Sequence, residues 1–334
     1  MLTNAAGCAS VRSVNATRQT FATQFPDRVM HASASRTIRY TLVATAVAAI
    51  ASVPLFAWGE RGHYLTGQAA AAMLPEEMPA FFRAAAAQLA YLNPEPDRWR
   101  DRAESALDPA LDQGSAADHF IDMELVPPER LAAALAAPNR YAYADTLRAA
   151  GVDAAKFGFL PFRMLELSQR LREEFRLWRA APNDQVRDWV QARIINDAGI
   201  LGHFVADGSN PAHTTVHFNG WVGPNPNGYA TDRRFHSRFE SAYVQTHIKI
   251  DDVLPGVDPT AASVGDLRPA IVGYLHATNS EVEHLYRLDK AAPFDTSTTS
   301  TEDKQFAAAR LAAGAQMLRN LWWTAWVTSA PASH

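Results

Sequence analysis

Histidine and carboxylate side chains recur at helical spacing in the middle of this 334-residue sequence. Residues four apart share one face of a helix, so two such side chains can converge on one ion without backbone strain. Imidazole nitrogens and carboxylate oxygens are typical ligands of zinc. Two such pairs and a histidine that follows a proline lie within 38 residues: His203 with Asp207, His213, and His236 with Glu240.

Further residues of the same types precede this segment. The stretch PDRWR contains Asp97, ADHFID contains His119, and WGERGH begins with Trp58 and ends with His63. The His-Glu-x-x-His motif of zinc proteases and the Gly-x-Ser-x-Gly elbow of serine hydrolases are both absent from the sequence. The pattern therefore favours a metal site, either in an enzyme or in a non-catalytic, zinc-stabilised binding protein.

A hydrophobic segment precedes the tryptophan. Arg36 and Arg39 are followed by an uncharged run of 18 residues that contains a proline and ends at Ala57. This layout is typical of a secretory signal peptide, whereas an 18-residue run with a proline is marginal for a membrane anchor. We expect residues 1–57 to be an N-terminal extension and signal peptide, with translation from Met30, cleavage after Ala57, and a secreted or periplasmic product.

Composition limits the partners of such a product. Without residues 1–57 the chain keeps 26 basic and 34 acidic residues, a net charge of −8. That charge opposes general binding of polyanions, so a phosphate ester has to be attracted by local cations. The only cysteine, Cys8, lies in the segment to be removed, so the product cannot depend on an internal disulfide.

These side chains have to be positioned by helices, because apolar residues recur with helical periodicity and strand-like alternation is nearly absent. Thr299 and Glu302 form a candidate capping box for the last helix. We expect an all-α protein in which residues 58–334 form a single multi-helix bundle domain. Long loops are expected at 93–118, 209–231 and 289–300. Helices are expected at 61–74, 76–92, 128–137, 140–150, 160–181, 184–208, 232–248, 265–288 and 301–328.

Taken together and in this order, the motifs resemble the zinc-dependent phospholipase C/P1 nuclease superfamily. The resemblance covers Trp58 to about Val244 and is carried by WGERGH, HFID at 119–122, and the spaced pairs described above. It implies an all-helical fold of that type and a hydrolase that cleaves phosphodiester bonds with three zinc ions per chain.

The resemblance also implies a ligand set for each ion. One zinc would take Asp97, His119, His203 and Asp207. A second would take His213, His236 and Glu240. A third would take His63, Asp207 as a bridge, and the α-amino nitrogen and carbonyl oxygen of Trp58. Since only a free N-terminus has that amine, removal of the signal peptide would complete the site.

By the same resemblance, Asp97 orients the attacking water, Arg100 clamps the phosphate, Phe120 stacks on a base and Asp122 binds the edge of that base. For Phe120, packing in the core is an alternative. Glu240 stands where the nuclease branch usually has aspartate, and this stretch looks more like bacterial phospholipase C. A single-strand nuclease with 3′-nucleotidase activity, acting on nucleic acid or nucleotides, is the first expectation. A phospholipase C that binds phospholipid head groups is the alternative. No obligate protein partner is inferred.

Overall fold

Helices make up the regular secondary structure of this protein. The computed structural model describes residues 58–331, and this part of the chain contains no β-strand beyond one isolated bridge between Phe218 and Gly220. The prediction of an all-α protein is therefore confirmed for the described residues. The expected signal peptide and its cleavage after Ala57 lie outside them. No helix in 58–331 is long and apolar enough to cross a membrane.

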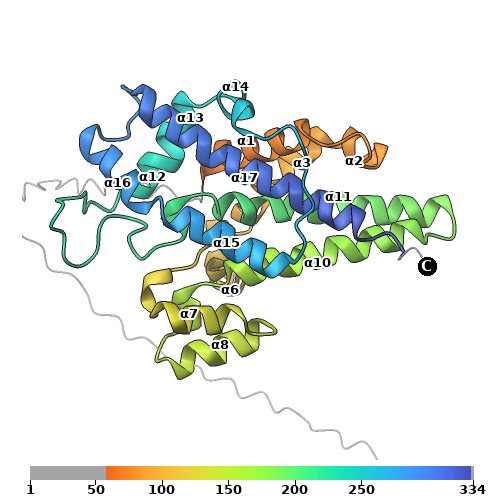
Figure 1. Ribbon diagram of the computed structural model, residues 1–334, viewed down its shortest axis with the longest axis horizontal. Coiled ribbons are helices and arrows are strands. Elements are labelled where there is room, and N and C mark those ends of the chain that lie inside the picture. The colour runs from red at the N-terminus through yellow and green to blue at the C-terminus, as the bar shows by residue number, and fades with distance from the viewer. Residues whose placement is uncertain (1–57, 332–334) are drawn as a thin grey trace, which may run out of the picture. The chain divides into compact units, whose positions relative to one another are not determined.

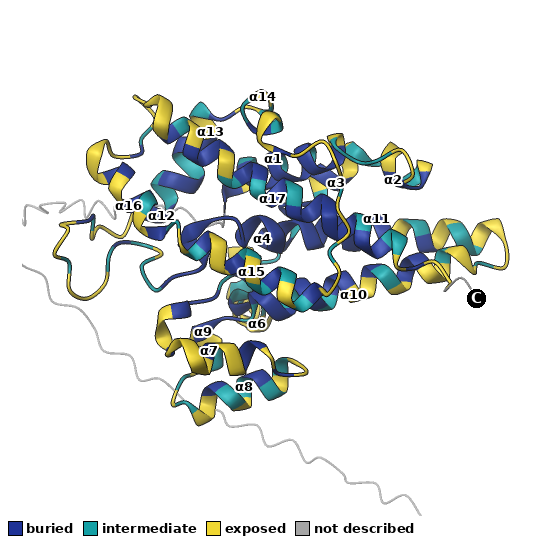
Figure 2. Cartoon of the chain, viewed as in Figure 1, coloured by how far each residue is buried: buried dark blue, intermediate teal, exposed yellow. Residues whose placement is uncertain are grey.

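Four helices build the centre of the molecule: α1 (Gly59–Ala72), α10 (Leu160–Arg179), α11 (Asp184–Asp207) and α17 (Thr301–Val327). α10 and α11 are joined by a short turn and lie side by side, and α17 packs against both of them and against α1 (Figure 1). From residue 197 to residue 207 every side chain of α11 is buried, as expected for a helix enclosed on all sides. Figure 2 shows this buried centre and the more exposed outer helices.

Two glycines let another helix approach α11 closely. The helix α3 (Ala86–Leu92) packs against α11, and Asn93 follows it directly. A Cβ atom on Gly202 would lie 2.1 Å from the side-chain amide of Asn93. A Cβ atom on Gly199 would lie 2.3 Å from Leu92 Cβ. Any larger residue at these two positions would push α3 and Asn93 away from the second half of α11.

Some helix boundaries differ from those expected. The expected helix 76–92 begins only at Ala80, after Pro79, and it is divided at Ala85 into α2 (Ala80–Ala84) and α3. The expected helix 265–288 is divided into α15 (Leu267–Asn279) and α16 (Val282–Ala291). At this break the Ser280 hydroxyl donates to the Ala277 carbonyl at 2.8 Å, a local bond that competes with helix continuation. The capping box of α17 consists of Ser300 and Asp303, one residue after the expected pair.

The expected loop 93–118 contains three short helices, so that prediction was wrong. They are α4 (Glu95–Arg98), α5 (Arg102–Leu107) and α6 (Ala110–Ala116). The Asp101 carboxylate caps α5 by accepting hydrogen bonds from the main-chain N–H groups of Ala103 and Glu104, at 2.9 and 3.0 Å. Neither α5 nor α6 has a buried side chain, so no apolar periodicity marks them in the sequence.

The remaining helices are short or peripheral. The expected helix 232–248 is a composite of α12, a π-helix and α13, because the middle of this segment has a wider turn than an α-helix. The α-helices still to be named are α7 (Pro128–Leu135), α8 (Arg140–Ala149), α9 (Ala154–Phe157), α12 (Phe235–Ser237), α13 (Val244–His247) and α14 (Ile250–Val253). The π-helix is η4 (Arg238–Tyr243), and the 3₁₀-helices are η1 (Ala117–His119), η2 (Met123–Leu125), η3 (Pro211–His213) and η5 (Leu254–Gly256).

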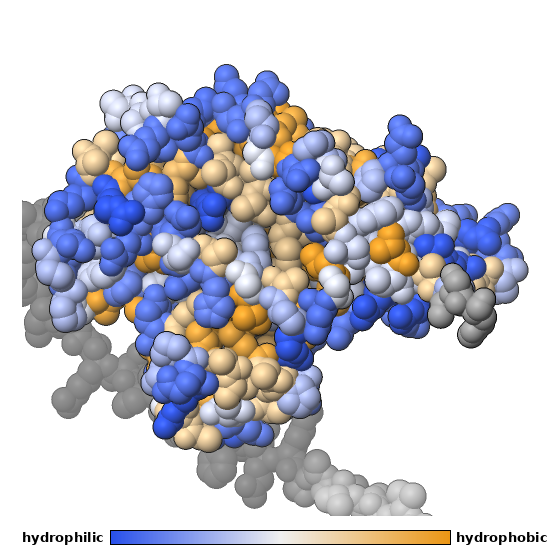
Figure 3. Space-filling model, in the orientation of Figure 1, coloured by the Kyte–Doolittle hydropathy of each residue, from blue (hydrophilic) through white to orange (hydrophobic). Residues whose placement is uncertain are grey.

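Hydrophilic side chains cover most of the face shown in Figure 3, and apolar ones gather where α7, α10 and α15 meet. Leu135, Phe162 and Ile271 belong to this junction and are buried. The cavity left between the three helices is only about 10 Å³, at the lower limit for a single water molecule. The space between these three helices is therefore too small to hold a ligand.

A pair of buried carboxyl groups links α10 to α11. The side chains of Glu174 and Asp197 are buried, and each has an arginine partner. Arg193 Nη2 lies 3.1 Å from Glu174 Oε1, and Arg170 is paired with Asp197. Burial, followed by the nearby charge of Asp197, raises the pKa of Glu174 to about 7.

Replacing Glu174 with glutamine should therefore change how stability depends on pH. Because the folded-state pKa lies above the ordinary 4.5, the folded protein holds this proton more tightly than the unfolded chain. The resulting stabilisation is complete below about pH 4.5 and is lost as the pH rises through about 7. We expect urea unfolding to show that the free energy of unfolding of Glu174→Gln, taken relative to wild type, is about 1–2 kcal/mol higher at pH 8 than at pH 5. Glu173→Gln, an exposed neighbour on α10, is the control, and parallel pH profiles for wild type and Glu174→Gln would contradict the interpretation.

Candidate metal centre

The predicted metal ligands converge on the buried C-terminal end of α11. They come from several elements and meet in the interior, where each of these residues is at most 8% exposed. The set consists of Trp58 just before α1, His63 on α1, Asp97 on α4, His119 on η1, His203 and Asp207 on α11, His213 on η3, His236 on α12, and Glu240 on η4.

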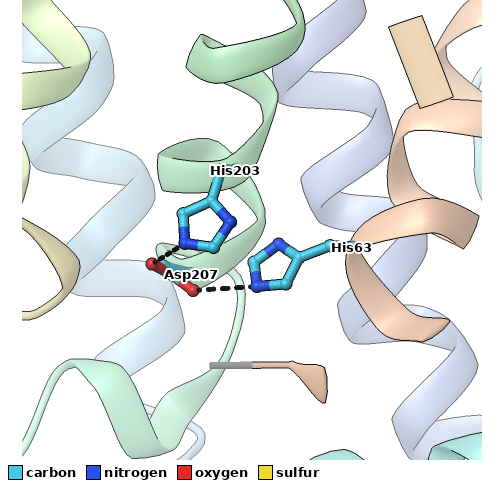
Figure 4. A group of neighbouring side chains, drawn as sticks. All are labelled: His63, His203 and Asp207. Atoms are coloured by element: carbon cyan, nitrogen blue, oxygen red, sulfur yellow. Dashed lines mark ion pairs between the residues drawn. The ribbon is translucent and has the colours of Figure 1, made fainter. Parts of the chain in front are cut away.

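Asp207, the last residue of α11, faces four histidines. Its Oδ2 lies 3.1 Å from His119 Nδ1 and 3.4 Å from His203 Nε2. Its Oδ1 lies 3.4 Å from His63 Nε2 and 3.8 Å from His213 Nδ1. Figure 4 shows the carboxylate with one oxygen toward His203 and the other toward His63. Because its two oxygens face different imidazoles, Asp207 can bridge two neighbouring ions.

Asp97 completes the group around His203. Its Oδ1 lies 3.8 Å from His203 Nε2 and 4.0 Å from His119 Nδ1, and its Oδ2 lies 3.8 Å from His63 Nε2. These side chains form two of the groups that could hold a metal ion: His63 with His203 and Asp207, and Asp97 with His119 and His203. His203 belongs to both groups, so the two candidate positions are adjacent.

The third group lies where η3 meets the helix that follows the 214–231 loop. His236 Nε2 lies 2.6 Å from Glu240 Oε2 and 3.1 Å from His213 Nε2. His213 Nε2 lies 3.5 Å from the same glutamate oxygen. Glu240 is in the π-helix η4, and π-turns are frequent at functional sites. The three side chains form the third group that could hold a metal ion.

The donor atoms have the spacing that one ion requires. Two atoms bound tetrahedrally at 2.0–2.1 Å from a zinc ion lie about 3.3 Å apart. The nitrogen–oxygen separations given above within the three groups run from 2.6 to 4.0 Å, and all donor atoms of a group lie within 4.8 Å of one another. Moreover, both carboxylate oxygens of Asp97 and Oδ1 of Asp207 accept no hydrogen bond from any residue in 58–331, although all three atoms are buried. Buried polar atoms are seldom left in this way, so the residues fit bound cations.

Two main-chain carbonyls orient the histidines. His203 Nδ1 donates to the Asn93 carbonyl at 3.0 Å, and His213 Nδ1 donates to the His119 carbonyl at 2.7 Å. A carbonyl oxygen can only accept, so both rings carry their proton on Nδ1 and direct the Nε2 lone pair toward the centre. The close approach of Asn93 to Gly202 is what brings the first carbonyl into reach.

Burial shifts the pKa values of these groups toward their neutral forms. Burial, followed by the repulsion between neighbouring carboxylates, raises the pKa of Asp97 and of Asp207 well above the ordinary value. Burial raises the pKa of Glu240 to about 7 and lowers that of His236 to about 4. Burial also lowers the pKa of His203 well below its usual range. Neutral imidazoles and clustered carboxyl groups favour a cation that displaces protons from the carboxyl groups.

Trp58 is fixed at the edge of this centre. Its indole N–H lies 2.7 Å from the Ala206 carbonyl and 3.0 Å from Ser209 Oγ, both acceptors at the end of α11. Its φ of 32° is the only positive value at a non-glycine residue in 58–331. Its main-chain N–H donates toward Glu240, which counteracts the upward shift of that carboxyl pKa. The nitrogen predicted to be a ligand therefore lies beside Glu240, while His63 faces Asp207 and Asp97.

A pocket of about 470 Å³ opens from the centre toward solvent. His119, His213 and His236 line its inner part, together with the residues predicted to bind substrate: Arg100, Phe120 and Asp122. Phe120 is partly exposed, so its ring is available to a ligand and is not enclosed in the core. Burial, with the added effect of Glu124, raises the pKa of Asp122 to about 7. Arg100 Nε donates to Asp112 of α6 at 2.9 Å.

Sequence reasoning missed several residues around the centre. Asn210 caps η3 and its side-chain amide donates to Glu240 Oε2 at 3.3 Å, and its position before Pro211 is a turn pattern that could have indicated this role. Asn93 acts through its main-chain carbonyl, which no side-chain pattern reports. Lys156 and Phe218 also line the pocket; Lys156 lies far from the motifs along the chain, and Phe218 follows His213 by five residues but belongs to no spacing pattern.

The fold and this centre together define an all-α protein with three buried His, Asp and Glu groups that could hold metal ions. No protein-family model, no curated protein and no solved structure matches the chain. Its function has to be inferred from the chemistry of the site.

Proposed function

We propose that this protein is a secreted zinc-dependent phosphodiesterase, and that its substrates are single-stranded nucleic acid and 3′-nucleotides. The observation that carries the proposal is the junction of the metal groups with the pocket. Ligand histidines of two groups, His119 and His213, line the same pocket as a guanidinium, Arg100, and an aromatic ring, Phe120. That combination suits a ligand with a phosphate at one end and a base at the other.

The three groups of side chains would hold three zinc ions, in sets that overlap those implied by the resemblance; the group around His63 contains His203 and Asp207, and Trp58 would be added to it as a ligand. Zinc, when bound, supplies positive charge that activates water and neutralises phosphoryl oxygens. Asp97 would accept a hydrogen bond from the attacking water, because its oxygens face the centre and have no hydrogen-bond donor in 58–331. Arg100 would bind the phosphate through the guanidinium nitrogens that do not contact Asp112, and Asp112 holds that guanidinium in place.

Phe120 and Asp122 would bind the nucleoside. Stacking of a base on an exposed aromatic ring contributes roughly 1–3 kcal/mol and tolerates any base, which suits a nuclease without sequence preference. The Asp122 carboxyl, with its pKa near 7, can either donate to or accept from a base edge around neutral pH. Phe120 and Asp122 lie in one segment, 120–122. This segment is held against η3 by a hydrogen bond from the Ile121 N–H to the His213 carbonyl, at 2.9 Å.

One observation favours a second candidate, a phospholipase C. The third metal group contains Glu240, and the resemblance associates glutamate at this position with the bacterial phospholipase branch. Glutamate and aspartate both offer carboxylate oxygens to zinc, so the residue leaves metal binding intact. The two candidates share the same reaction at phosphorus and differ in the group attached to the phosphate.

Parallel assays on purified, zinc-loaded protein that starts at Trp58 would separate the candidates. We expect nucleotides to be released from single-stranded DNA, activity to disappear with a chelator, and activity to return with zinc. Release of diacylglycerol from phosphatidylcholine without release of nucleotides would establish the second candidate. Inactivity toward both substrates, with fewer than two zinc ions per chain, would favour a non-catalytic zinc-stabilised binding protein.

A further inference from the structure

Lys156 lines the same pocket and has no role in the site described so far. It is exposed, lies on α9, and shares the pocket with Phe120 and Asp122. Its ammonium forms no ion pair with any carboxylate in 58–331. The other cation of the pocket, Arg100, is paired with Asp112. Lys156 is therefore the unpaired cation of the pocket.

The backbone that carries Lys156 is fixed relative to the predicted base-binding residues. The Asp122 N–H donates to the Phe157 carbonyl at 2.8 Å, and the Leu160 N–H donates to the Phe120 carbonyl at 3.3 Å. Gly158 between them has a φ of 100°, and a Cβ there would lie 1.9 Å from the Phe120 carbonyl oxygen. Only glycine permits this close approach, so α9 and the segment 120–122 form one unit.

The charges around the pocket select the kind of ligand that this lysine can bind. An ammonium without a carboxylate partner attracts an anionic group and repels a cationic one, most strongly where low-dielectric walls limit screening. Arg100 supplies a first phosphate position beside the metal groups. Lys156, on the unit that holds Phe120, supplies a second cation on the side of the base. A nucleotide with phosphates at both ends presents a ring and two anions in one molecule.

We propose that Lys156 binds a second phosphate of the substrate, on the far side of the base from the phosphate held at Arg100. Lys156 is then a specificity-determining residue that favours polyanionic chains, such as oligonucleotides, over esters with a cationic head group. This inference rests on the proposed function, since it assumes that a nucleotide occupies the pocket.

Equilibrium binding tests the lysine separately from hydrolysis. Calorimetry on zinc-loaded protein, with each 3′-phosphate replaced by a non-hydrolysable 3′-phosphonate because the proposed activity would cleave it, should show thymidine 3′,5′-bisphosphate binding about tenfold more tightly than thymidine 3′-monophosphate. Lys156→Ala should abolish this difference and leave binding of the monophosphate unchanged, and Lys156→Arg should restore it. Lys249→Ala removes an exposed lysine next to α14 that does not line the pocket, so it should behave as wild type.

Kinetics with two dinucleotides give the matching activity test. The thymidine dinucleotide with a 5′-phosphate should have a KM about tenfold lower than the one without it, at similar kcat, and Lys156→Ala should remove this advantage. A wild type that does not distinguish the two nucleotides in calorimetry, or a Lys156→Ala variant that still does, overturns the inference. Lysine-dependent binding of the bisphosphate without cleavage of either dinucleotide would instead support the inference and reject the proposed nuclease activity.

Discussion

On the proposed function, replacing Asp207 with asparagine is expected to remove bound zinc from the centre and to lower the rate of phosphodiester hydrolysis on the order of 10³-fold, about 4 kcal/mol in activation free energy. The two oxygens of this carboxylate face the imidazoles of two different metal groups, at 3.1 to 3.8 Å. Asparagine has the same shape but no negative charge, so both groups lose the anion that they share. Zinc per chain, measured by atomic emission, should fall by at least one ion.

The same substitution should have the opposite effect on the zinc-free protein. Burial raises the pKa of Asp207 well above its ordinary value, so ionising it without a cation opposes folding. In a chelator at neutral pH, Asp207→Asn should therefore melt no lower than wild type, whereas in zinc it should melt lower. A merely structural aspartate would not give this reversal.

Asp197→Asn provides the matched control, because Asp197 is a buried aspartate on the same helix, ten residues earlier and paired with Arg170. It should keep its zinc and its activity. An Asp207→Asn protein with unchanged zinc content and wild-type activity would show that this carboxylate is not a metal ligand.

A chain that retains Ala57 before Trp58 is expected to bind one zinc ion at least about tenfold more weakly and to lose most of its activity. An amide nitrogen has no available lone pair, whereas a free amine can bind a metal. The Trp58 nitrogen lies beside Glu240, and the indole is held by Ala206 and Ser209. An added residue thus changes the chemistry of the nitrogen at an anchored position.

Two preparations that differ by this one residue would test the claim, through zinc content, kcat and KM. Trp58→Phe at a free N-terminus is the control, because it keeps the amine and changes only the side chain, which loses its indole hydrogen bonds and part of its packing. It should retain more zinc than the extended chain. Equal zinc content and equal kcat in the extended and trimmed forms would rule out the N-terminal amine as a ligand.

The long helices could be predicted closely, and the short ones could not. α11 begins after Asn183, whose side chain accepts a hydrogen bond from the Val186 N–H, and both ends lie within one residue of those expected. By contrast, α5 and α6 have six and seven residues and no buried side chain, so they leave no periodic pattern. The capping box was misplaced by one residue because Thr299 with Glu302 and Ser300 with Asp303 both fit the pattern, and only the tertiary structure selects the second pair.

The candidate site, like the fold, could be predicted from the sequence only in part. Pairs within one helix, such as His203 with Asp207, follow from spacing, and the structure places their ring nitrogen and carboxylate 3.4 Å apart. The contacts that orient the rings cross between elements. Asn93 reaches His203 only because Gly202 lets two helices approach, and that distance is a property of packing. The position of Lys156 in the pocket likewise depends on packing, because the hydrogen bond from the Asp122 N–H to the Phe157 carbonyl holds α9 beside the segment 120–122.

A transplant of this metal centre into another helical scaffold would have to include the π-helix η4. It holds Glu240 next to His236 on its N-terminal side and continues into α13 on its C-terminal side. Each residue of an ordinary α-helix advances the direction of its side chain by about 100°. An α-helix of the same length would therefore change the rotation between the glutamate and the core-facing residues that follow it. A graft has to carry the wide turn with the ligands, since copying their sequence spacing alone would leave the glutamate or the following helix facing the wrong way.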